Sequence, residues 1–260
     1  AFGYDLEDAG GRKLGASSAA GVFSCKADGT DLQIFGQGTI NPVEVMFTPA
    51  GELFTTVAIF DNEGGRHDAL MHWVDGCLSK QVWGKPLLPQ TGHPLPAVCR
   101  WGQVAPAGLM RYRGAGLSDE YKNNIFACQF DTHQVMRVEL ERNGSSFLPT
   151  RDEPWLTSSE IDFHPTDIFE DADGSLLMID TGGWLYYGCP TSKIAKPNIY
   201  GAIYRLRQKG MKKIDDPRGN QLDWEQAPNE EMVTWLDDPR PAVRDRAIDT
   251  LARRLDEAVD

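Results

Sequence analysis

A strand-turn-strand pattern occurs twice in the sequence and constrains the fold more than any other feature. Residues 41–54 read NPVEVMFTPAGELF, and residues 164–177 read HPTDIFEDADGSLL. In each copy a proline is followed two places later by a carboxylate, and then by apolar residues, a glycine and a leucine. A looser copy begins at Pro106. Self-similarity of this kind is typical of repeat architectures, and each copy predicts a β-hairpin.

Further strands are expected around these hairpins. An Asp-Gly turn at 27–30 predicts a hairpin within 21–37. A complete four-stranded unit is expected at 109–112, 125–130, 135–140 and 146–148. The remaining strands are expected at 43–47, 52–60, 69–74, 166–169, 176–179 and 202–206. Four-stranded antiparallel units that are arranged radially protect their edges, so the mainly β region 1–214 is interpreted as a partial β-propeller of four-stranded blades.

The composition changes near the end of the chain. Residues 215–228 are polar and are interpreted as a linker, and residues 229–260 are expected to form a pair of helices. The apolar positions of these helices are Met232, Val233, Trp235, Leu236, Val243, Ala247, Ile248 and Leu251. The pair resembles a HEAT repeat. A single repeat cannot bury its own apolar face, so the pair packs on the propeller or the chain continues.

Charge and apolar content limit the classes of partner. The chain of 260 residues has 41% hydrophobic residues and a net charge of −12. Phosphate binding needs clustered Lys and Arg, so nucleic acid is not expected as a partner. No stretch is apolar enough for a membrane-spanning helix. The chain does not begin with Met, and we expect it to be processed or part of a longer protein.

The five cysteines are an odd number and contain no C-x-x-C pair, so neither a zinc ribbon nor covalent haem is expected. Cys25 and Cys128 lie in apolar strand patterns and are expected to be buried. Cys77 and Cys99 flank a Pro-rich loop, and a disulfide between them remains open if the compartment is oxidising.

Several longer segments resemble one known family. These segments are 100–109 (RWGQVAPAGL), 128–133 (CQFDTH), 162–167 (DFHPTD) and 188–205. They resemble the bacterial membrane-bound dehydrogenase-like β-propeller family, which is related to the sugar and sorbosone dehydrogenases that use pyrroloquinoline quinone (PQQ). The resemblance implies an exported, periplasmic or cell-surface protein with further domains, a sugar-like substrate, and PQQ and calcium as cofactors.

The candidate site residues are polar side chains at the ends of the expected inner strands and at nearby turns, because such positions line a propeller channel. His is the usual base for removing a hydroxyl proton, and an acidic Gly-rich loop can bind Ca²⁺. The catalytic candidates are His164, Asp167 and His133. The cofactor-binding candidates are Asn41, Glu44, Asp131 and Asp180. The metal candidates are Asp61, Asn62 and Asp68. Structural histidines and a solvated loop are the alternatives.

Two functions follow from these residues. The first is a PQQ-dehydrogenase-like oxidoreductase that acts on a sugar or a related alcohol. Ile40 stands where the resemblance predicts an Arg, and this favours the second function, a non-catalytic scaffold that binds carbohydrate, or a protein through its helical C-terminus.

Residues outside the inner strands are assigned mainly structural roles. Residues 171–174 are expected to form a hairpin turn rather than a calcium loop. Arg137, Arg205 and Arg207 are expected to pair with carboxylates. The aromatic residues Trp184, Tyr186 and Tyr187 either stack on a sugar ring or cap the last blade.

Overall fold

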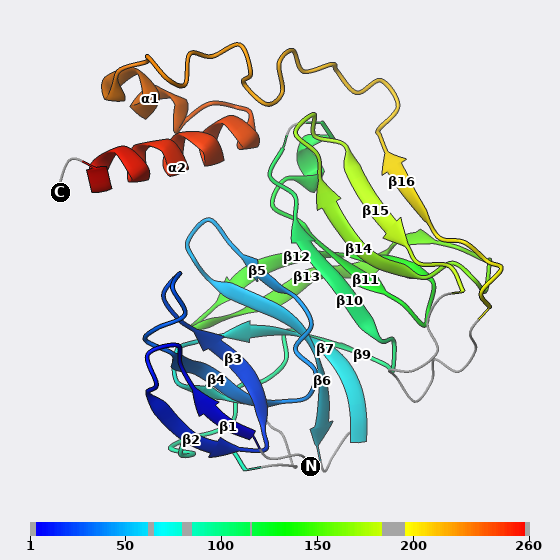
Figure 1. Ribbon diagram of the computed structural model, residues 1–260. Coiled ribbons are helices and arrows are strands. Elements are labelled where there is room, and N and C mark those ends of the chain that lie inside the picture. Colours follow the sequence, from blue (N-terminus) through cyan, green and yellow to red (C-terminus); the bar gives the residue numbers. More distant parts are fainter. Residues whose placement is uncertain (1–3, 62–64, 80–84, 115, 184–195, 258–260) are drawn as a thin grey trace. The chain divides into compact units, whose positions relative to one another are not determined.

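The computed structural model describes residues 4–61, 65–79, 85–114, 116–183 and 196–257 (Figure 1). The described residues form several sheets and two C-terminal helices, as the mainly β prediction requires. Contacts divide the chain into two compact units, which are described separately. Unit 1 comprises residues 1–111, 125–168 and 179–202, and unit 2 comprises residues 112–124, 169–178 and 203–260.

Two four-stranded antiparallel sheets contain most of the long strands. The first has the order β5-β6-β7-β9, and the second has the order β10-β11-β12-β13. The strands of the first sheet are Val45–Phe47, Leu53–Asp61, Gly65–Trp73 and Cys99–Trp101. Those of the second are Pro106–Arg111, Ile125–Gln129, Gln134–Asn143 and Ser146–Thr157. The second sheet is the complete unit that the sequence predicts.

The smaller sheets account for the remaining strands. They have the orders β1-β2, β3-β4-β8 and β14-β15-β16. Their strands are Tyr4–Glu7 and Lys13–Ser17, then Ala20–Ser24, Gln33–Thr39 and Cys77–Leu78, and finally Pro165–Glu170, Leu176–Asp180 and Ala202–Leu206. A short 3-10 helix spans Asp119–Tyr121. The sheets β5-β6-β7-β9, β10-β11-β12-β13 and β14-β15-β16 each begin with an end strand that follows a repeat proline, and we call β5, β10 and β14 the inner strands.

The repeated sequence forms the same hairpin turn in both copies. In the turn at 48–52, the N–H of residue 48 donates to the carbonyl of residue 52 (3.0 Å), and that of Gly51 donates to the carbonyl of residue 48 (3.0 Å). The equivalent bonds in the turn at 171–175 are both 2.8 Å long. Gly51 and Gly174 have φ of +79° and +78°, which is why each copy has glycine at this place. The predicted turn at 171–174 is confirmed.

The core of unit 1 is built from the apolar faces of the two four-stranded sheets. Phe54, Leu70, Leu109 and Ala127 belong to one buried cluster. Trp73 lies in a second cluster and donates from Nε1 to Thr55 Oγ1 (2.7 Å), so its polar atom is satisfied inside the core.

The cysteines differ in part from expectation. Cys128 is fully buried, as predicted. The prediction for Cys25 is wrong, because β3 ends one residue earlier and the side chain is exposed. Cys77 and Cys99 are free thiols rather than a disulfide. Cys189 lies outside the described residues.

The helical part of unit 2 has its own small core. The helices are α1 (Asn229–Trp235) and α2 (Pro241–Glu257). Their buried cluster consists of Trp224, Ala227, Met232, Trp235, Val243 and Ala247. Two of these residues come from the segment that was expected to be a linker, so that segment forms part of the helical core. Val233, Leu236 and Ile248 are exposed, although the sequence places them on apolar faces.

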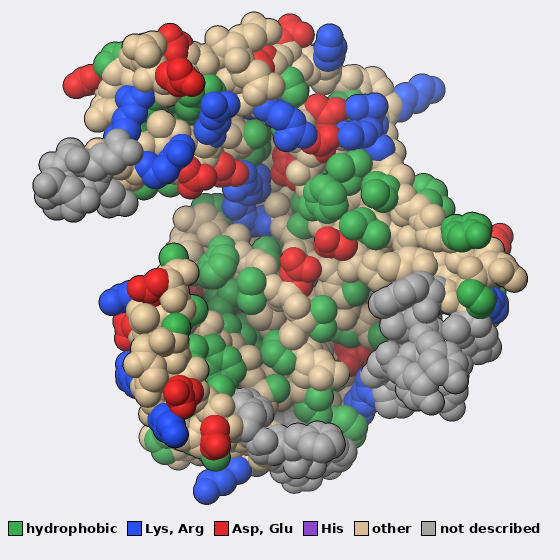
Figure 2. Space-filling view, in the orientation of Figure 1, with side chains coloured by type: hydrophobic (Ala, Val, Ile, Leu, Met, Phe, Trp, Pro, Cys, Tyr) green, Lys and Arg blue, Asp and Glu red, His purple; other side chains and the backbone are tan. Residues whose placement is uncertain are grey.

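Side chains of both charges lie on the face drawn in Figure 2. Lys and Arg side chains are interspersed with Asp and Glu over the face drawn in Figure 2. Neither helix of the described chain has the length and apolar character that a membrane span requires.

Candidate functional site

The second position after the repeat proline differs among the three inner strands. It is Glu44 just before β5, Gly108 in β10 and Asp167 in β14. A Cβ atom added to Gly108 would lie 2.5 Å from Asp167 Oδ1 and 2.6 Å from its Cα. The middle copy therefore has no side chain at the place where β14 comes closest to β10, and only glycine fits there.

Glu44 and Asp167 interact across this glycine position. Burial raises the pKa of Glu44, and the negative charge of Asp167 raises it further, while a hydrogen bond from the backbone of Leu109 opposes the rise. Burial also raises the pKa of the Cys128 thiol, with contributions from Asp167 and Glu44. The Glu44 carboxyl and the Cys128 thiol are therefore both desolvated by burial, and the charge of Asp167 acts on each of them.

His133 and His164 form a second group in unit 1. His133 Nδ1 lies 2.6 Å from the carbonyl oxygen of Phe163, and His164 Nδ1 lies 2.8 Å from that of Gly182. A carbonyl oxygen only accepts hydrogen bonds, so both Nδ1 atoms carry the proton. The ring centroids of the two histidines are 5.2 Å apart, and Phe130 stacks on His164 at 4.2 Å.

The turn between β11 and β12 positions His133. Its N–H donates to the Phe130 carbonyl (3.4 Å), and its own carbonyl accepts from Ser158 (2.9 Å). His133 has φ of +56°, a left-handed conformation that a residue other than glycine adopts only where its surroundings hold it. The backbone of His133 is therefore held on both sides, and its ring is held by the Phe163 carbonyl.

Asp180 holds the other histidine through the backbone. It is buried at the end of β15, and its Oδ1 accepts from the N–H groups of His164 (2.9 Å) and Gly182 (2.8 Å). Asp180 was predicted to bind a cofactor, and here its contacts are those of a positioning residue. Asp131 lies in the turn of His133, and Asn41 is exposed with φ of +46°.

Of the three predicted metal ligands, Asp68 alone has a described side chain. Asp68 lies inside β7 and is buried, and its Oδ2 accepts from the N–H groups of Val104 (2.7 Å) and Ala105 (2.9 Å). The side chain of Asp61 and the whole of Asn62 lie outside the described residues, as do Trp184, Tyr186 and Tyr187. In the part of the chain that is described, no three His, Cys, Asp or Glu side chains are grouped to hold a metal ion.

A polar network around His72 was missed by the sequence analysis. His72 is fully buried in β7, with Nε2 2.8 Å from Glu52 Oε2 and Nδ1 3.2 Å from Ser146 Oγ. Arg142 also pairs with Glu52, and its pairing and the hydrogen bond with His72 lower the pKa of that carboxyl. Glu52 is thus held between β7 and the hairpin of β12 and β13. No local pattern signals such a network, because its partners come from separate strands.

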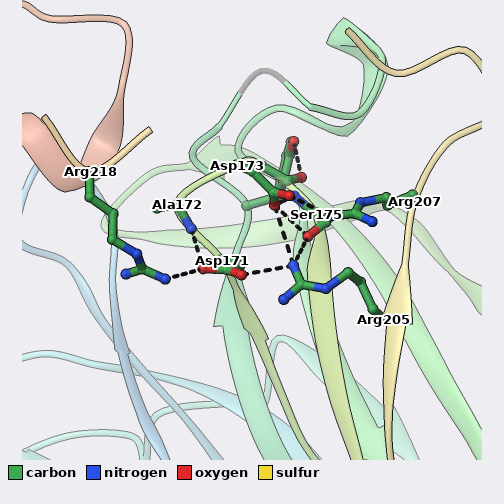
Figure 3. Close-up of polar contacts among 9 residues, drawn as sticks. Asp171, Ala172, Asp173, Ser175, Arg205, Arg207 and Arg218 are labelled. Carbon is green, nitrogen blue, oxygen red and sulfur yellow. Dashed lines mark hydrogen bonds and ion pairs between the residues drawn. The ribbon is translucent and has the colours of Figure 1, made fainter. Parts of the chain in front are cut away.

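A second network lies on the repeated hairpin turn in unit 2. Asp171 accepts from Arg205 (2.7 Å) and Arg218 (2.6 Å), and Asp173 accepts from Arg207 (2.8 Å), as Figure 3 shows. The pairing of Arg205 and Arg207 with carboxylates is confirmed. Both carboxylates are paired with arginines, so the turn is stabilised by ion pairs.

Comparisons with known proteins give no family assignment. No family model matches the chain, and no curated protein matches it. Among solved structures, one described as an oxidoreductase (glucose dehydrogenase) from Thermus thermophilus is 18% identical, with a TM-score of 0.45 over 66% of this chain and 46% of that one.

Two aldose sugar dehydrogenases give similar values. The PQQ-bound enzyme from Streptomyces coelicolor is 13% identical, with a TM-score of 0.47 over 74% of this chain and 58% of that one. The soluble enzyme from Escherichia coli, in its apo-form, is 13% identical, with a TM-score of 0.41 over 60% and 45%. The chain thus spans about half the length of each, and these values are too low to assign an activity to it.

Proposed function

We propose that the protein is a propeller-type oxidoreductase that acts on a sugar or a related alcohol in the periplasm or at the cell surface, as part of a longer chain. The observation that carries this proposal is the state of His164. Its Nδ1 proton is directed to the Gly182 carbonyl, so Nε2 is left as a proton acceptor at the start of an inner strand. Oxidation of an alcohol needs a base for the hydroxyl proton, and His is the side chain most often used.

The surroundings of His164 support this role. Phe130 stacks on one face of the ring, and Asp180 holds the backbone on which the ring is mounted. Because the histidine makes these contacts, little of its freedom remains to be lost when a hydroxyl binds. His133 offers a second Nε2 acceptor, in a ring whose centroid lies 5.2 Å from that of His164.

The described residues do not fit the carboxylates of PQQ. Such groups are held in proteins by Arg or Lys, but the side chains grouped at the inner strands are Glu44 and Asp167, and residue 40 is Ile. The steps assigned to this chain are therefore hydroxyl binding and proton acceptance, and none is assigned to PQQ.

A non-catalytic scaffold that binds carbohydrate is the second candidate. The pair of Glu44 and Asp167 favours it, because two partly buried acceptors can hold a neutral sugar without any redox group. A scaffold requires neither PQQ nor a base at His164, and the two functions are distinguished by the role of that ring.

Titration of the full-length protein with PQQ and Ca²⁺ tests the proposal, together with turnover of a sugar panel using a dye as electron acceptor. We expect sugar-dependent dye reduction by the full-length protein, which His164→Ala lowers roughly 10²-fold or more, the usual contribution of a positioned base. Asp167→Ala is expected to weaken binding of the sugar. His93→Ala, at an exposed loop position, is the matched control. If a folded sample binds sugar but shows neither PQQ binding nor turnover, the result contradicts the oxidoreductase and supports the non-catalytic scaffold.

A further inference from the structure

His133 and His164 share a feature that proton acceptance by His164 does not require. Both rings have the same tautomer, and each Nδ1 is held by a backbone carbonyl, of Phe163 at 2.6 Å and of Gly182 at 2.8 Å. We propose that His133 and His164 together bind a divalent transition-metal ion of the Cu²⁺, Ni²⁺ and Zn²⁺ class through their Nε2 atoms. The proposal goes beyond the proposed function and involves neither sugar nor PQQ.

The hydrogen bonds at Nδ1 are those that metal-binding histidines make. A histidine ligand usually donates its other ring N–H to a carboxylate or a backbone carbonyl, which fixes the tautomer, orients the ring and raises the basicity of the ligating nitrogen. Both His133 and His164 meet this condition before any metal is present. Their Nε2 lone pairs therefore need no tautomeric change to bind an ion.

The separation of the rings fits a shared ion. Metal–nitrogen bonds to imidazole are about 2.0–2.1 Å long, and a tetrahedral angle between two such bonds places the ring centroids about 5 Å apart. The centroids of His133 and His164 are 5.2 Å apart, with 61° between the ring planes. Phe130 is stacked on His164 and the backbone holds His133 in its turn, so both rings are already positioned.

The ligand set selects the class of metal. Imidazole nitrogen suits Cu²⁺, Ni²⁺ and Zn²⁺, whereas Ca²⁺ and Mg²⁺ need oxygen ligands. Two neighbouring carboxylates have other partners: Asp180 accepts from two backbone N–H groups, and Asp162 pairs with Lys196 at 2.6 Å. We therefore expect two imidazole nitrogens and water molecules as the ligands. Among these metals, the affinity of the site is expected to be highest for Cu²⁺.

A bound metal ion would affect the role proposed for His164. An Nε2 lone pair that binds an ion is no longer available to accept a hydroxyl proton, so metal loading is expected to block proton acceptance by His164. Protons compete with the metal for the same lone pairs, and affinity for the metal therefore falls as the pH is lowered.

Metal binding is measured on the metal-free full-length protein by calorimetry with Cu²⁺ and by electron paramagnetic resonance, in the absence of sugar and PQQ. We expect one strong site whose spectrum shows two nitrogen ligands. His133→Gln or His164→Gln removes one arm of the chelate and should weaken binding roughly 10²-fold. His93→Gln is the matched control and should bind as the wild type does.

The variants also separate this site from copper that is bound elsewhere on the protein. The proposal is overturned if the double variant His133→Gln/His164→Gln, shown to be folded by circular dichroism, binds Cu²⁺ as the wild type does, or if the wild type gives no signal from two nitrogens. Copper binding is measured without turnover of a sugar. If the protein binds copper at this site but oxidises no sugar, the result therefore counts against the proposed function and not against the metal site.

Discussion

Asp173 illustrates how a single side chain of the repeat acquires a special environment. Burial alone would raise the pKa of its carboxyl, but hydrogen bonds from Ser175 (2.5 Å) and Arg207 (2.8 Å) outweigh burial and lower the pKa to about 2. The equivalent place in the other copy is Ala50, which has no such contacts to make. The turn geometry is thus shared by both copies, whereas the ion pairs belong to one of them.

Asp173→Asn is expected to destabilise the protein and to reduce its sensitivity to acid. A carboxyl whose pKa is lowered on folding contributes stability above its unfolded value of 3.8, and this stability is lost as the pH falls toward about 2. Arg207 is 55% exposed, so screening by solvent reduces the contribution, and we expect a loss of about 1–2 kcal/mol at pH 7. Urea unfolding between pH 7 and pH 2 measures both effects.

Asp119→Asn is the matched control for this experiment, because Asp119 is an exposed carboxylate of the 3-10 helix. The ion-pair argument fails if both variants lose the same amount of stability, or if Asp173→Asn keeps the pH dependence of the wild type.

At the scale of elements, the helical part of unit 2 depends on one side chain that joins α2 to the preceding segment. The guanidinium of Arg254 donates to the carbonyls of Ala227 (2.7 Å), Trp224 (3.1 Å) and Glu225 (3.1 Å), and to Asn229 Oδ1 (3.0 Å). It therefore satisfies several acceptors of a segment with no regular secondary structure.

Arg254→Gln is expected to lower the stability of the helical part by about 1–3 kcal/mol, because acceptors bonded to a charged donor lose their partner. Trp224 and Trp235 pack against each other there with ring centroids 4.7 Å apart, so near-ultraviolet circular dichroism of this tryptophan pair during denaturation measures the loss. Arg253→Gln is the control, since Arg253 makes one long hydrogen bond to Asp249 (3.3 Å). Equal effects of the two substitutions would contradict the role of Arg254.

The helices also show where sequence periodicity stops being informative. The existence of both helices and the burial of Met232, Trp235, Val243 and Ala247 follow from their spacing. The exposure of Val233 and Ile248 does not, because Trp224 and Ala227 cover part of the helix pair from a segment that is polar overall. A pattern read within one element cannot show which other segment packs on it.

Some features of the candidate site also follow from the sequence, and others depend on packing between segments. Glu44, Asp167 and His164 are candidates because of their places in the repeat, and His133 is a candidate because it follows a predicted strand. The close approach of Asp167 to Gly108 and the carbonyl partners of the two histidines depend on how separate strands pack. The network of His72, Glu52 and Ser146 was missed for the same reason.

At the scale of the whole molecule, strand order along the sheets follows the sequence with two exceptions. In β10-β11-β12-β13 every strand pairs with the next in the chain. By contrast, β9 pairs with β7 across the Pro-rich segment, and β8 pairs with β4 in parallel across the β5–β7 strands. Neither of these pairings was predicted, because their strands are short and their partners are distant in sequence.

This strand order has a consequence for the time course of folding. The entropy lost on closing a loop grows with its length, so hairpins between consecutive strands are expected to form before β4–β8 and β7–β9. In pulse-labelling hydrogen exchange during refolding, the amides of β6–β7 and β12–β13 should therefore become protected before those of β8 and β9. Simultaneous protection of all strands would contradict this order. While β9 is still unpaired, the outer edge of β7 is open, and during that interval a folding chain is most exposed to pairing with a neighbouring chain.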